Sequence, residues 1–309
     1  MPQNPETSQR WAEHTVTAEE AGRTVEEILT GAMQISRRMI QRLTRSRGIQ
    51  LNRRPAFLAR KVRAGDVVAA RVARDEEPGL EPVPMELAVV HEDGTLLVVD
   101  KPPFLLVHPT SPGHRATLSH GIAHRYAQQG LRARVRPVHR LDRDTSGLLV
   151  VAKSDFAHQH LDRQLRERTF TRLYLALVEG APGEESGVVD APIGRHRANP
   201  SLRAVRPGGE PARTRWRVVE RYAGAALLEL ELETGRTHQI RVHLAHLGHP
   251  LLGDRQYGGR ALPGLRRQAL HAWRVSFVHP ASGEPVSFEA PLPPDLEAAR
   301  EALRAGRNA

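Results

Sequence analysis

The sequence predicts an α+β protein with two folding units, and three observations lead to this expectation. The chain of 309 residues is long enough to form more than one hydrophobic core. Its first part has two short helical patterns and then strand-like runs, whereas the part beyond residue 87 has many strands and few helices at irregular spacing. Between them, residues 76–86 (EEPGLEPVPME) mix acidic residues, Pro and Gly without a period, which is typical of a linker.

The first unit is expected at residues 14–75, after a polar tail at 1–13. Thr24 followed three residues later by Glu27 predicts a capping box and a short helix after it. Ser36 is a suitable N-cap for a second helix. The unit is therefore expected to be a small α/β domain.

The second helix of this unit has an arginine-rich face opposite its apolar residues. The exposed cations expected there are Arg37, Arg38, Arg42 and Arg45. With the strand-like runs at 49–51 and 67–72, the unit resembles the small RNA-binding domain named after the fourth small-subunit ribosomal protein. That resemblance implies that Arg37, Arg38 and Arg42 bind RNA, although Asn52 precedes Arg53 where the family usually has Asn-Gly. The alternative is an ordinary amphipathic helix pair with a solvated face.

The second unit is expected at residues 87–296, before a short tail at 297–309. The runs 95–99 and 148–151 are continuously apolar, as expected of strands covered on both faces. Residues 228–233 alternate Leu with Glu, which predicts a strand with one wet face. A hairpin with residues 216–219 is expected because Ala223-Gly224 separates the two runs. We expect a mixed, largely antiparallel sheet with the active cleft near its centre.

Another helix is expected between Thr237 and Leu247. Ile240, Leu244 and Leu247 recur at helical spacing, and Gly248 provides a C-terminal stop. From Pro294 onward the pattern indicates a short surface helix and a frayed end.

Composition narrows the classes of function. The formal net charge of +10 favours a polyanionic partner, although a solvated basic surface is the alternative. The absence of cysteine excludes disulfides, thiolate nucleophiles and zinc sites with sulfur ligands. No apolar stretch is long enough to span a bilayer, and the start lacks the pattern of a secretory signal, so we expect a cytoplasmic protein with no membrane partner.

Residues 138–154 (VHRLDRDTSGLLVVAKS) contain the strongest candidate for chemistry. Asp142 lies on a polar turn that enters an apolar strand, where a side chain is held firmly and yet can be reached. Arg140 and Arg143 flank it, and nearby cations favour an ionised carboxylate, as a nucleophile requires. The alternative is an aspartate that only caps the turn or pairs with an arginine.

Residues 234–254 contain two arginines and four histidines. His243, His246 and His249 recur every third residue, but paired histidine ligands on a helix prefer a four-residue step, and no closely spaced carboxylate completes a ligand set. We therefore expect no metal and interpret the histidines as structural or as RNA contacts. Tyr174 lies in an apolar strand pattern at 169–180 and, by its own pattern, is an ordinary core aromatic.

The segment HRLDRDTSGLLVVAKS at 139–154 resembles the signature of the RluA family of pseudouridine synthases. Three more segments are similar to family motifs in the same order: HEDGTLLVVDKPPFLLVHP at 91–109, GRTHQIRVHLAHLGHPLLGD at 235–254 and LHAWRVSFVHP at 270–280. With APIGR at 191–195, the resemblance spans residues 87–293. It implies a pseudouridine synthase fold. Together with the N-terminal unit, the chain resembles the family's large-subunit ribosomal RNA enzymes.

The resemblance also implies roles for individual residues. Asp142 would be the catalytic aspartate, and Tyr174 would lie against the target ring as a plausible proton acceptor. Arg241 would pair with Asp142 and hold its carboxylate ionised. Arg140 would enter the space left by the flipped nucleotide, and His139 beside it would be a further substrate contact. Support for the catalytic loop would come from Lys101 and Pro102.

The sequence departs from the family at three places. Asp100 precedes Lys101 where asparagine is usual, and Glu210 stands where lysine is common. Pro103-Phe104 replaces a small residue and glycine. These departures affect substrate contacts rather than the reaction.

The expected function is isomerisation of specific uridines in structured RNA, most naturally large-subunit ribosomal RNA, by a monomer that needs no cofactor and no metal. Such an enzyme flips the target nucleotide out of the RNA before the glycosidic bond breaks. Three rivals remain: a hydrolase that releases free uracil, a non-catalytic RNA-binding or ribosome-assembly protein, and a phosphate-binding metal enzyme.

Overall fold

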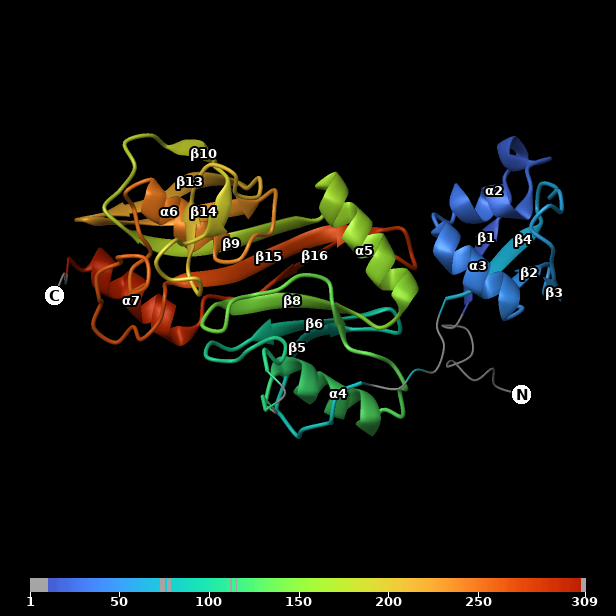
Figure 1. The fold of residues 1–309 in the computed structure, drawn as a ribbon, viewed down its shortest axis with the longest axis horizontal. Helices are drawn as coiled ribbons and strands as arrows, with labels where there is room; N and C mark the ends of the chain where they lie inside the picture. Colours follow the sequence, from blue (N-terminus) through green and yellow to red (C-terminus); the bar gives the residue numbers. More distant parts are fainter. Residues whose placement is uncertain (1–10, 73–75, 77–78, 112, 115, 307–309) are drawn as a thin grey trace.

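The computed structural model describes residues 11–72, 76, 79–111, 113–114 and 116–306, and it confirms the expected α+β class. A small N-terminal domain lies at one end of a larger domain built on a long twisted sheet (Figure 1). The last helix, α7 (Pro294–Arg304), lies at the opposite end of the larger domain (Figure 1). In the described part of the chain, no helix combines the length and the apolar character needed to cross a bilayer.

The N-terminal domain has a four-stranded sheet in the order β1-β4-β2-β3. Its elements are β1 (Trp11–Thr15), η1 (Ala18–Glu20), α2 (Val25–Thr30), α3 (Arg37–Arg45), β2 (Ile49–Leu51), β3 (Arg54–Pro55) and β4 (Val67–Arg71). Both predicted N-caps are confirmed, because the side chains of Thr24 and Ser36 accept hydrogen bonds from the backbone N–H groups of Glu27 and Met39.

The predicted polar tail at 1–13 is wrong at its end. Strand β1 begins at Trp11, which is paired with Arg71, and the ladder continues to Thr15 opposite Val67. The strand is half exposed and carries Glu13 and His14, so it has no apolar run that a sequence pattern could detect. Backbone pairing with β4 makes it a strand. Residues 1–10 lie outside the described part.

The larger domain has a ten-stranded sheet whose main path runs β10-β13-β14-β9-β15-β8-β6-β5, with β16 paired to β15 and β7 to β8. Its strands are β5 (Ala88–Glu92), β6 (Leu96–Lys101), β7 (Arg136–Pro137), β8 (Ser146–Ala152), β9 (Thr171–Glu179), β10 (Ser186–Asp190), β13 (Arg213–Tyr222), β14 (Ala225–Leu232), β15 (Leu270–Val278) and β16 (Pro285–Glu289). A separate ribbon pairs β11 (Ile193–Arg195) with β12 (Arg203–Val205). Among the described strands of this sheet, β8 and β15 are the parallel neighbours and the other pairs are antiparallel, which confirms the mixed sheet.

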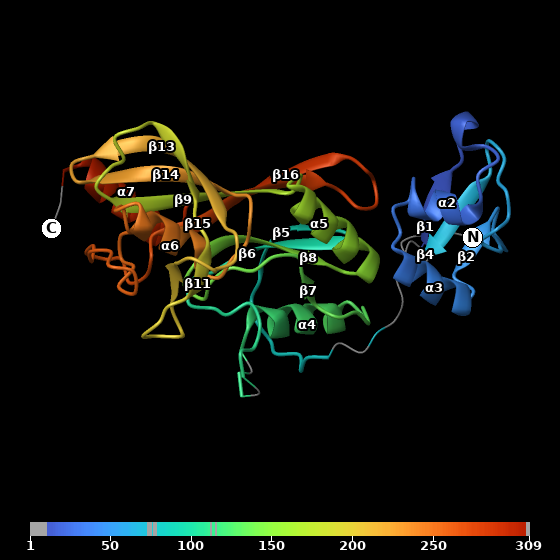
Figure 2. The same ribbon diagram turned by 45° about the horizontal axis from the view of Figure 1, so that its top comes forward.

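Four helices accompany this sheet: α4 (Leu118–Gln128), α5 (Asp155–Glu167), α6 (Gln239–His246) and α7 (Pro294–Arg304). Strand β8 is buried on both faces, because Leu149 and Val151 pack in a cluster with α4 whereas Leu148 and Val150 pack in a cluster with α5. The two helices lie on different sides of this part of the sheet (Figure 2). This double cover explains why residues 148–151 form a continuous apolar run.

The predicted hairpin and helix are both present. Strands β13 and β14 pair antiparallel, with Trp216 opposite Leu230 and Arg217 opposite Glu229. The helix expected at 237–247 is shorter and begins only at Gln239, because the preceding residue, His238, has a non-helical φ of 58°. The structural consequence is a sharp entry into α6.

Two predicted boundaries need correction. The tail assigned to 297–309 is largely helical, since α7 runs to Arg304 and buries Leu303 against the larger domain. Residues 307–309 lie outside the described part. In the segment assigned as a linker, the Val83 N–H donates to the His120 carbonyl, and Met85 packs on Gly121 of α4. These contacts attach that segment to the larger domain. The local sequence pattern could not predict them, because the partners lie in α4, far along the chain.

The N-terminal domain is docked on the start of α5. Arg42 of α3 pairs with Asp155 at 2.6 Å, and the Ser36 hydroxyl donates to Gln159 at 2.8 Å. Phe156, also from α5, is buried in the N-terminal domain's hydrophobic cluster. Both polar and apolar contacts therefore fix the orientation of α3 relative to the larger domain.

His271, a buried residue of β15 that contacts β8, predicts that the protein loses stability in acid. The His271 Nε2–H donates to the Ala290 carbonyl at 3.1 Å, so Nδ1 accepts from the Ser146 hydroxyl at 2.9 Å and the ring is neutral. Burial lowers the pKa of His271 to about 4. Between a pH of about 4 and the usual histidine pKa of about 6.5, His271 is protonated in the unfolded chain but stays neutral in the folded protein. The free energy of unfolding therefore falls as the pH drops from about 6.5 towards 4.

For this one group, we expect a loss on the order of 3 kcal/mol in the free energy of unfolding between pH 7 and 4. Urea unfolding at several pH values measures it. His271→Gln keeps polar atoms for both partners but does not titrate, so its stability should vary less with pH than that of the parent. Equal pH dependence in the two proteins would contradict this assignment.

Candidate active site

The predicted catalytic aspartate lies on the loop between β7 and β8, near the centre of the sheet. The Thr145 N–H donates to the Asp142 carbonyl at 3.2 Å and closes the turn. Gly147, the second residue of the buried strand β8, has a φ of +113°, and a Cβ there would lie 2.2 Å from the Ala272 carbonyl oxygen on β15. A glycine is thus required where the loop enters β8, and the loop is anchored directly to the neighbouring strand.

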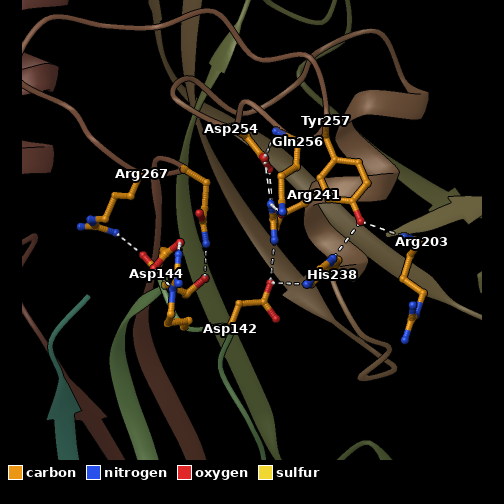
Figure 3. Close-up of polar contacts among 12 residues, drawn as sticks. Asp142, Asp144, Arg203, His238, Arg241, Asp254, Gln256, Tyr257 and Arg267 are labelled. Atoms are coloured by element: carbon orange, nitrogen blue, oxygen red, sulfur yellow. Dashed lines mark hydrogen bonds and ion pairs between the residues drawn. The ribbon is translucent and has the colours of Figure 1, made fainter. Parts of the chain in front are cut away.

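Arg241 of α6 reaches this aspartate from a fixed position. Its Nε and Nη2 donate to the two carboxylate oxygens of Asp254 at 2.7 and 2.8 Å, and Nη2 also donates to Gln256 at 2.7 Å. The guanidinium lies over the Tyr257 ring, with 4.8 Å between its central carbon and the ring centroid. Its remaining Nη1 points at Asp142, 3.4 Å from Oδ2 (Figure 3).

His238 approaches the same carboxylate from the start of α6. Its Nε2 is 3.9 Å from Asp142 Oδ2, and its Nδ1 is 2.8 Å from the Tyr257 hydroxyl (Figure 3). The Arg203 N–H donates to that hydroxyl at 2.9 Å. Burial lowers the pKa of His238 although the Asp142 charge opposes this shift. The imidazole therefore favours its neutral form more than a free histidine does.

The structure brings Tyr174 of β9 into the same place. A cavity of about 50 Å³ is lined by Asp142, Tyr174 and Arg241, together with Arg140 and His238. The Tyr174 side chain is buried, and burial raises the pKa of its hydroxyl, with Arg172 opposing and Asp142 adding to the rise. The phenol therefore stays protonated at neutral pH.

The two arginines that flank Asp142 in the sequence were expected to keep its carboxylate ionised, but the structure shows them in other positions. Arg143 is exposed and pairs with Asp144 through hydrogen bonds of 2.7 and 3.0 Å. Arg140 is exposed at the rim of the cavity. The cation bonded to Asp142 is instead Arg241, since the turn sends consecutive side chains in different directions.

His139 lies away from this cavity, contrary to the expectation of a substrate contact. Its Nε2 accepts from the Val150 N–H at 3.3 Å, and its ring makes an edge contact with Phe170 at a centroid distance of 5.9 Å. Burial lowers the pKa of His139 to about 3, so the ring is neutral. Its position indicates a structural role behind the loop.

The arginines of α3 divide into two groups. Arg37 and Arg38 are exposed, whereas Arg42 is bound to Asp155 of the larger domain. A direct RNA contact by Arg42 would compete with this ion pair. The sequence could not reveal that, because Asp155 lies more than a hundred residues away.

The loop that carries Asp142 has a buried support. Lys101 at the end of β6 donates from Nζ to the carbonyls of Pro102, Leu105 and Arg143 at 2.8, 2.9 and 3.0 Å. Burial lowers the pKa of Lys101 to about 7. One ammonium group thus ties the loop after β6 to the loop that carries Asp142.

The histidine series after Arg241 has structural partners. His243 contacts the Thr214 hydroxyl and the Ala191 carbonyl, at 2.9 and 3.0 Å, and His249 contacts the Glu179 carbonyl at 3.0 Å. Within the described residues, no group of three or more His, Asp or Glu side chains is arranged to hold a metal ion.

Sequence reasoning missed four residues around Asp142: His238, Asp254, Gln256 and Tyr257. His238 and Asp254 lie in the stretch 234–254, which stands out for its arginines and histidines, whereas Gln256 and Tyr257 follow it. Their roles around Arg241 depend on how the chain returns after α6, and no spacing rule indicates this.

Comparisons with known proteins agree with this architecture. The family model described as RNA pseudouridylate synthase matches residues 95–246, and the model of the RluD ribosomal pseudouridine synthase N-terminal domain matches residues 12–68. The RNA pseudouridine synthase YhcT of Bacillus subtilis is 41% identical over 290 residues, which cover 93% of this chain and 96% of that protein. The ribosomal large subunit pseudouridine synthase D of Nitrosomonas europaea is 41% identical over 304 residues, covering 94% and 88%.

Solved structures show the same likeness. Human RNA pseudouridylate synthase domain containing 4 superposes with a TM-score of 0.58 at 25% identity, covering 70% of this chain and 93% of that one. Human RNA pseudouridylate synthase domain containing 1 gives 0.56 at 29% identity, covering 74% and 98%.

The mixed sheet and the two matched domains are those of an RNA-modifying isomerase. The chain belongs to the RNA pseudouridine synthase family. The expected family, fold and reaction are thus confirmed, and the isomerase is favoured over a non-catalytic RNA-binding protein.

Proposed function

We propose that this enzyme converts specific uridines of large-subunit ribosomal RNA to pseudouridine, with Asp142 as its reactive carboxylate. The observation that carries the proposal is the position of Asp142, which meets Arg241 and Tyr174 in one cavity between β8, β9 and α6. The names of relatives such as the ribosomal large subunit pseudouridine synthase D support the choice of RNA.

The reaction breaks the bond between uracil N1 and the ribose C1′, turns the ring and forms a bond from C5 to C1′. The proton on C5 then leaves and N1 gains one, so no electrons enter or leave. Asp142 acts on the sugar or adds to the ring, and in either case the ionised carboxylate is the reacting form. Arg241 supports it with one hydrogen bond, while Asp254 and Gln256 fix the arginine's direction.

Tyr174 lies against the flipped uracil and accepts the C5 proton in this proposal. Because its raised pKa keeps the phenol protonated, Tyr174 takes the C5 proton only while it passes its own hydroxyl proton on, directly or through a water, to the uracil N1 that gains one. We expect Tyr174→Phe to slow the formation of pseudouridine by roughly 10²- to 10⁴-fold, the range for one acid–base group. RNA binding should remain, since the ring is kept. Filter binding and a 5-tritium release assay separate the two effects, and equal rates for variant and parent would remove the hydroxyl from the mechanism.

The N-terminal domain supplies phosphate contacts through Arg37 and Arg38. We expect the variant Arg37→Ala/Arg38→Ala to bind RNA with a shallower dependence of log Kobs on log salt, the slope falling by about 1 for each phosphate that the variant no longer neutralises. Arg42→Ala is the matched comparison, because its guanidinium is already paired with Asp155, and it should change the slope less. A larger change for Arg42 than for the pair would reverse this assignment.

In this proposal the N-terminal domain, from β1 to β4, binds RNA, and the larger domain, which ends with α7, carries out the reaction. We propose that the chain works as a monomer in the cytoplasm without cofactor or metal. The basic net charge of +10 supports an encounter with RNA driven by phosphate.

The test uses unmodified ribosomal and transfer RNA transcripts tritiated at C5 of uridine, with and without a chelator. We expect tritium release from large-subunit RNA, no free uracil, and no effect of the chelator. Free uracil would identify a glycosidase, and loss of activity with chelator would identify a metal enzyme. Binding without release would favour an assembly protein.

A further inference from the structure

Phe104 has a backbone conformation that its side chain disfavours. Its φ is 65°, in the left-handed region. The other described non-glycine residues with positive φ are polar: Gln34, Arg47, Asn52, Arg53, Arg168 and His238. A bulky side chain in this region is strained, and such strain persists only where the surrounding structure enforces it. Glycine would adopt this conformation freely.

Burial does not account for this phenylalanine. Its side chain is 54% exposed, whereas the residues around it point inward: Leu105 packs against the main core and Val107 is buried. An exposed ring gains little from the hydrophobic effect and so does not offset the strain of its backbone. Folding alone therefore gives no reason for an aromatic residue here.

The loop that presents Phe104 is fixed at both ends and joined to the catalytic loop. At its start, the ammonium group of Lys101 binds the Leu105 carbonyl and the Arg143 carbonyl together. At its end, His108 contacts the Ser119 hydroxyl at 2.9 Å. Because Arg143 directly follows Asp142, the half-exposed ring lies on a segment that Lys101 ties to the loop carrying Asp142.

We propose that Phe104 stacks on an unpaired nucleobase next to the target uridine. This inference rests on the proposed function, because flipping the target takes it out of the RNA stack and leaves its neighbours without a partner. An aromatic face is a platform for any such base, and enzymes that flip bases select substrates partly through the flanking nucleotides. The ring would thus be a substrate-binding residue that helps to hold the open RNA conformation.

Three variants test the ring separately from the backbone. Phe104→Gly removes the ring and the strain, Phe104→Ala removes the ring alone, and Phe104→Trp keeps an aromatic face. Stacking on one base corresponds to about a 5- to 150-fold effect on affinity. We expect kcat/KM for tritium release from large-subunit RNA to fall by that factor in the Gly and Ala variants and to stay near the parent value with Trp. Thermal unfolding should show that the Gly variant is at least as stable as the parent.

Val219→Ala, which removes another half-exposed apolar side chain on β13, is the matched control and should leave the rate unchanged. Once the modified uridine is mapped, RNA with an abasic residue on either side completes a double-mutant cycle. The abasic penalty should be present with the parent and absent with Phe104→Ala.

The outcomes separate the two proposals. If the parent releases tritium and Phe104→Gly matches it, the inference is wrong and the proposed function stands. If the rate of the Gly variant falls only in step with a lower melting temperature, the ring is structural. If the parent releases no tritium, the proposed function fails and this inference fails with it.

Discussion

Replacing Asp142 by Asn is expected to abolish pseudouridine formation while leaving RNA binding intact. The amide has nearly the shape of the carboxylate but cannot supply a negative charge or a nucleophilic oxygen. We expect tritium release to slow by roughly 10⁴-fold or more, as when a reacting group is removed from a site that otherwise stays assembled. Single-turnover tritium release with excess enzyme measures the chemical step, and filter binding measures affinity.

Asp144→Asn is the matched control on the same loop. Its carboxylate pairs with the exposed Arg143, while its backbone carbonyl accepts from Arg267. The variant keeps the backbone hydrogen bond and removes the ion pair with the exposed Arg143, which contributes little. Like Asp142→Asn, it also removes one of the negative charges that favour the ammonium form of Lys101. Activity near the parent level is therefore expected. If Asp144→Asn is as inactive as Asp142→Asn, the loss of activity comes from the loop's structure and not from one carboxylate.

The second large effect is expected at Arg241, in both stability and rate. The side chains of Arg241 and Asp254 are only 6% and 1% exposed, so Arg241→Met leaves a buried carboxylate without its main partner. Breaking a buried pair from one side costs about 3–5 kcal/mol of folding free energy. We also expect the rate to fall by roughly 10²- to 10³-fold, since Asp142 loses its fixed donor.

A double variant separates these two effects. In Arg241→Met/Asp254→Asn the stranded charge is gone, so urea unfolding should show most of the stability restored. The rate should stay low, because nothing replaces the donor that faced Asp142. Recovery of both stability and rate would show that Arg241 only supports the fold.

Much of the fold was readable from local patterns. The caps at Thr24 and Ser36 and the alternation in 228–233 depend on neighbours in sequence, and the structure contains the elements they predict. Strand β1 was missed because its pairing with β4 brings together residues about fifty positions apart. The helix expected from Pro294 onward is present as α7, but residues from 297 were assigned to a tail outside the domain, because the apolar partners of Leu303 come from distant strands.

The candidate site was predicted only in part. Asp142 stood out because a polar turn enters an apolar strand. Tyr174 has no local signal, and only the resemblance to a family pointed to it. The predicted partners of two arginines were wrong: Arg143 forms an ion pair with Asp144, and Arg42 forms one with Asp155. Which carboxylate an arginine meets depends on three-dimensional distance.

By itself, the sequence determined the class of protein, its basic charge, the absence of thiol chemistry and the loop that bears the candidate carboxylate Asp142. These properties follow from composition, short-range periodicity and the resemblance of its motifs to those of one family. Only the tertiary structure decided that Asp254, Gln256 and Tyr257 fix Arg241, and that Phe104 is strained and exposed beside the same loop. The physical reason is that hydrogen bonds, ion pairs and burial depend on which distant segments the packed sheet brings together.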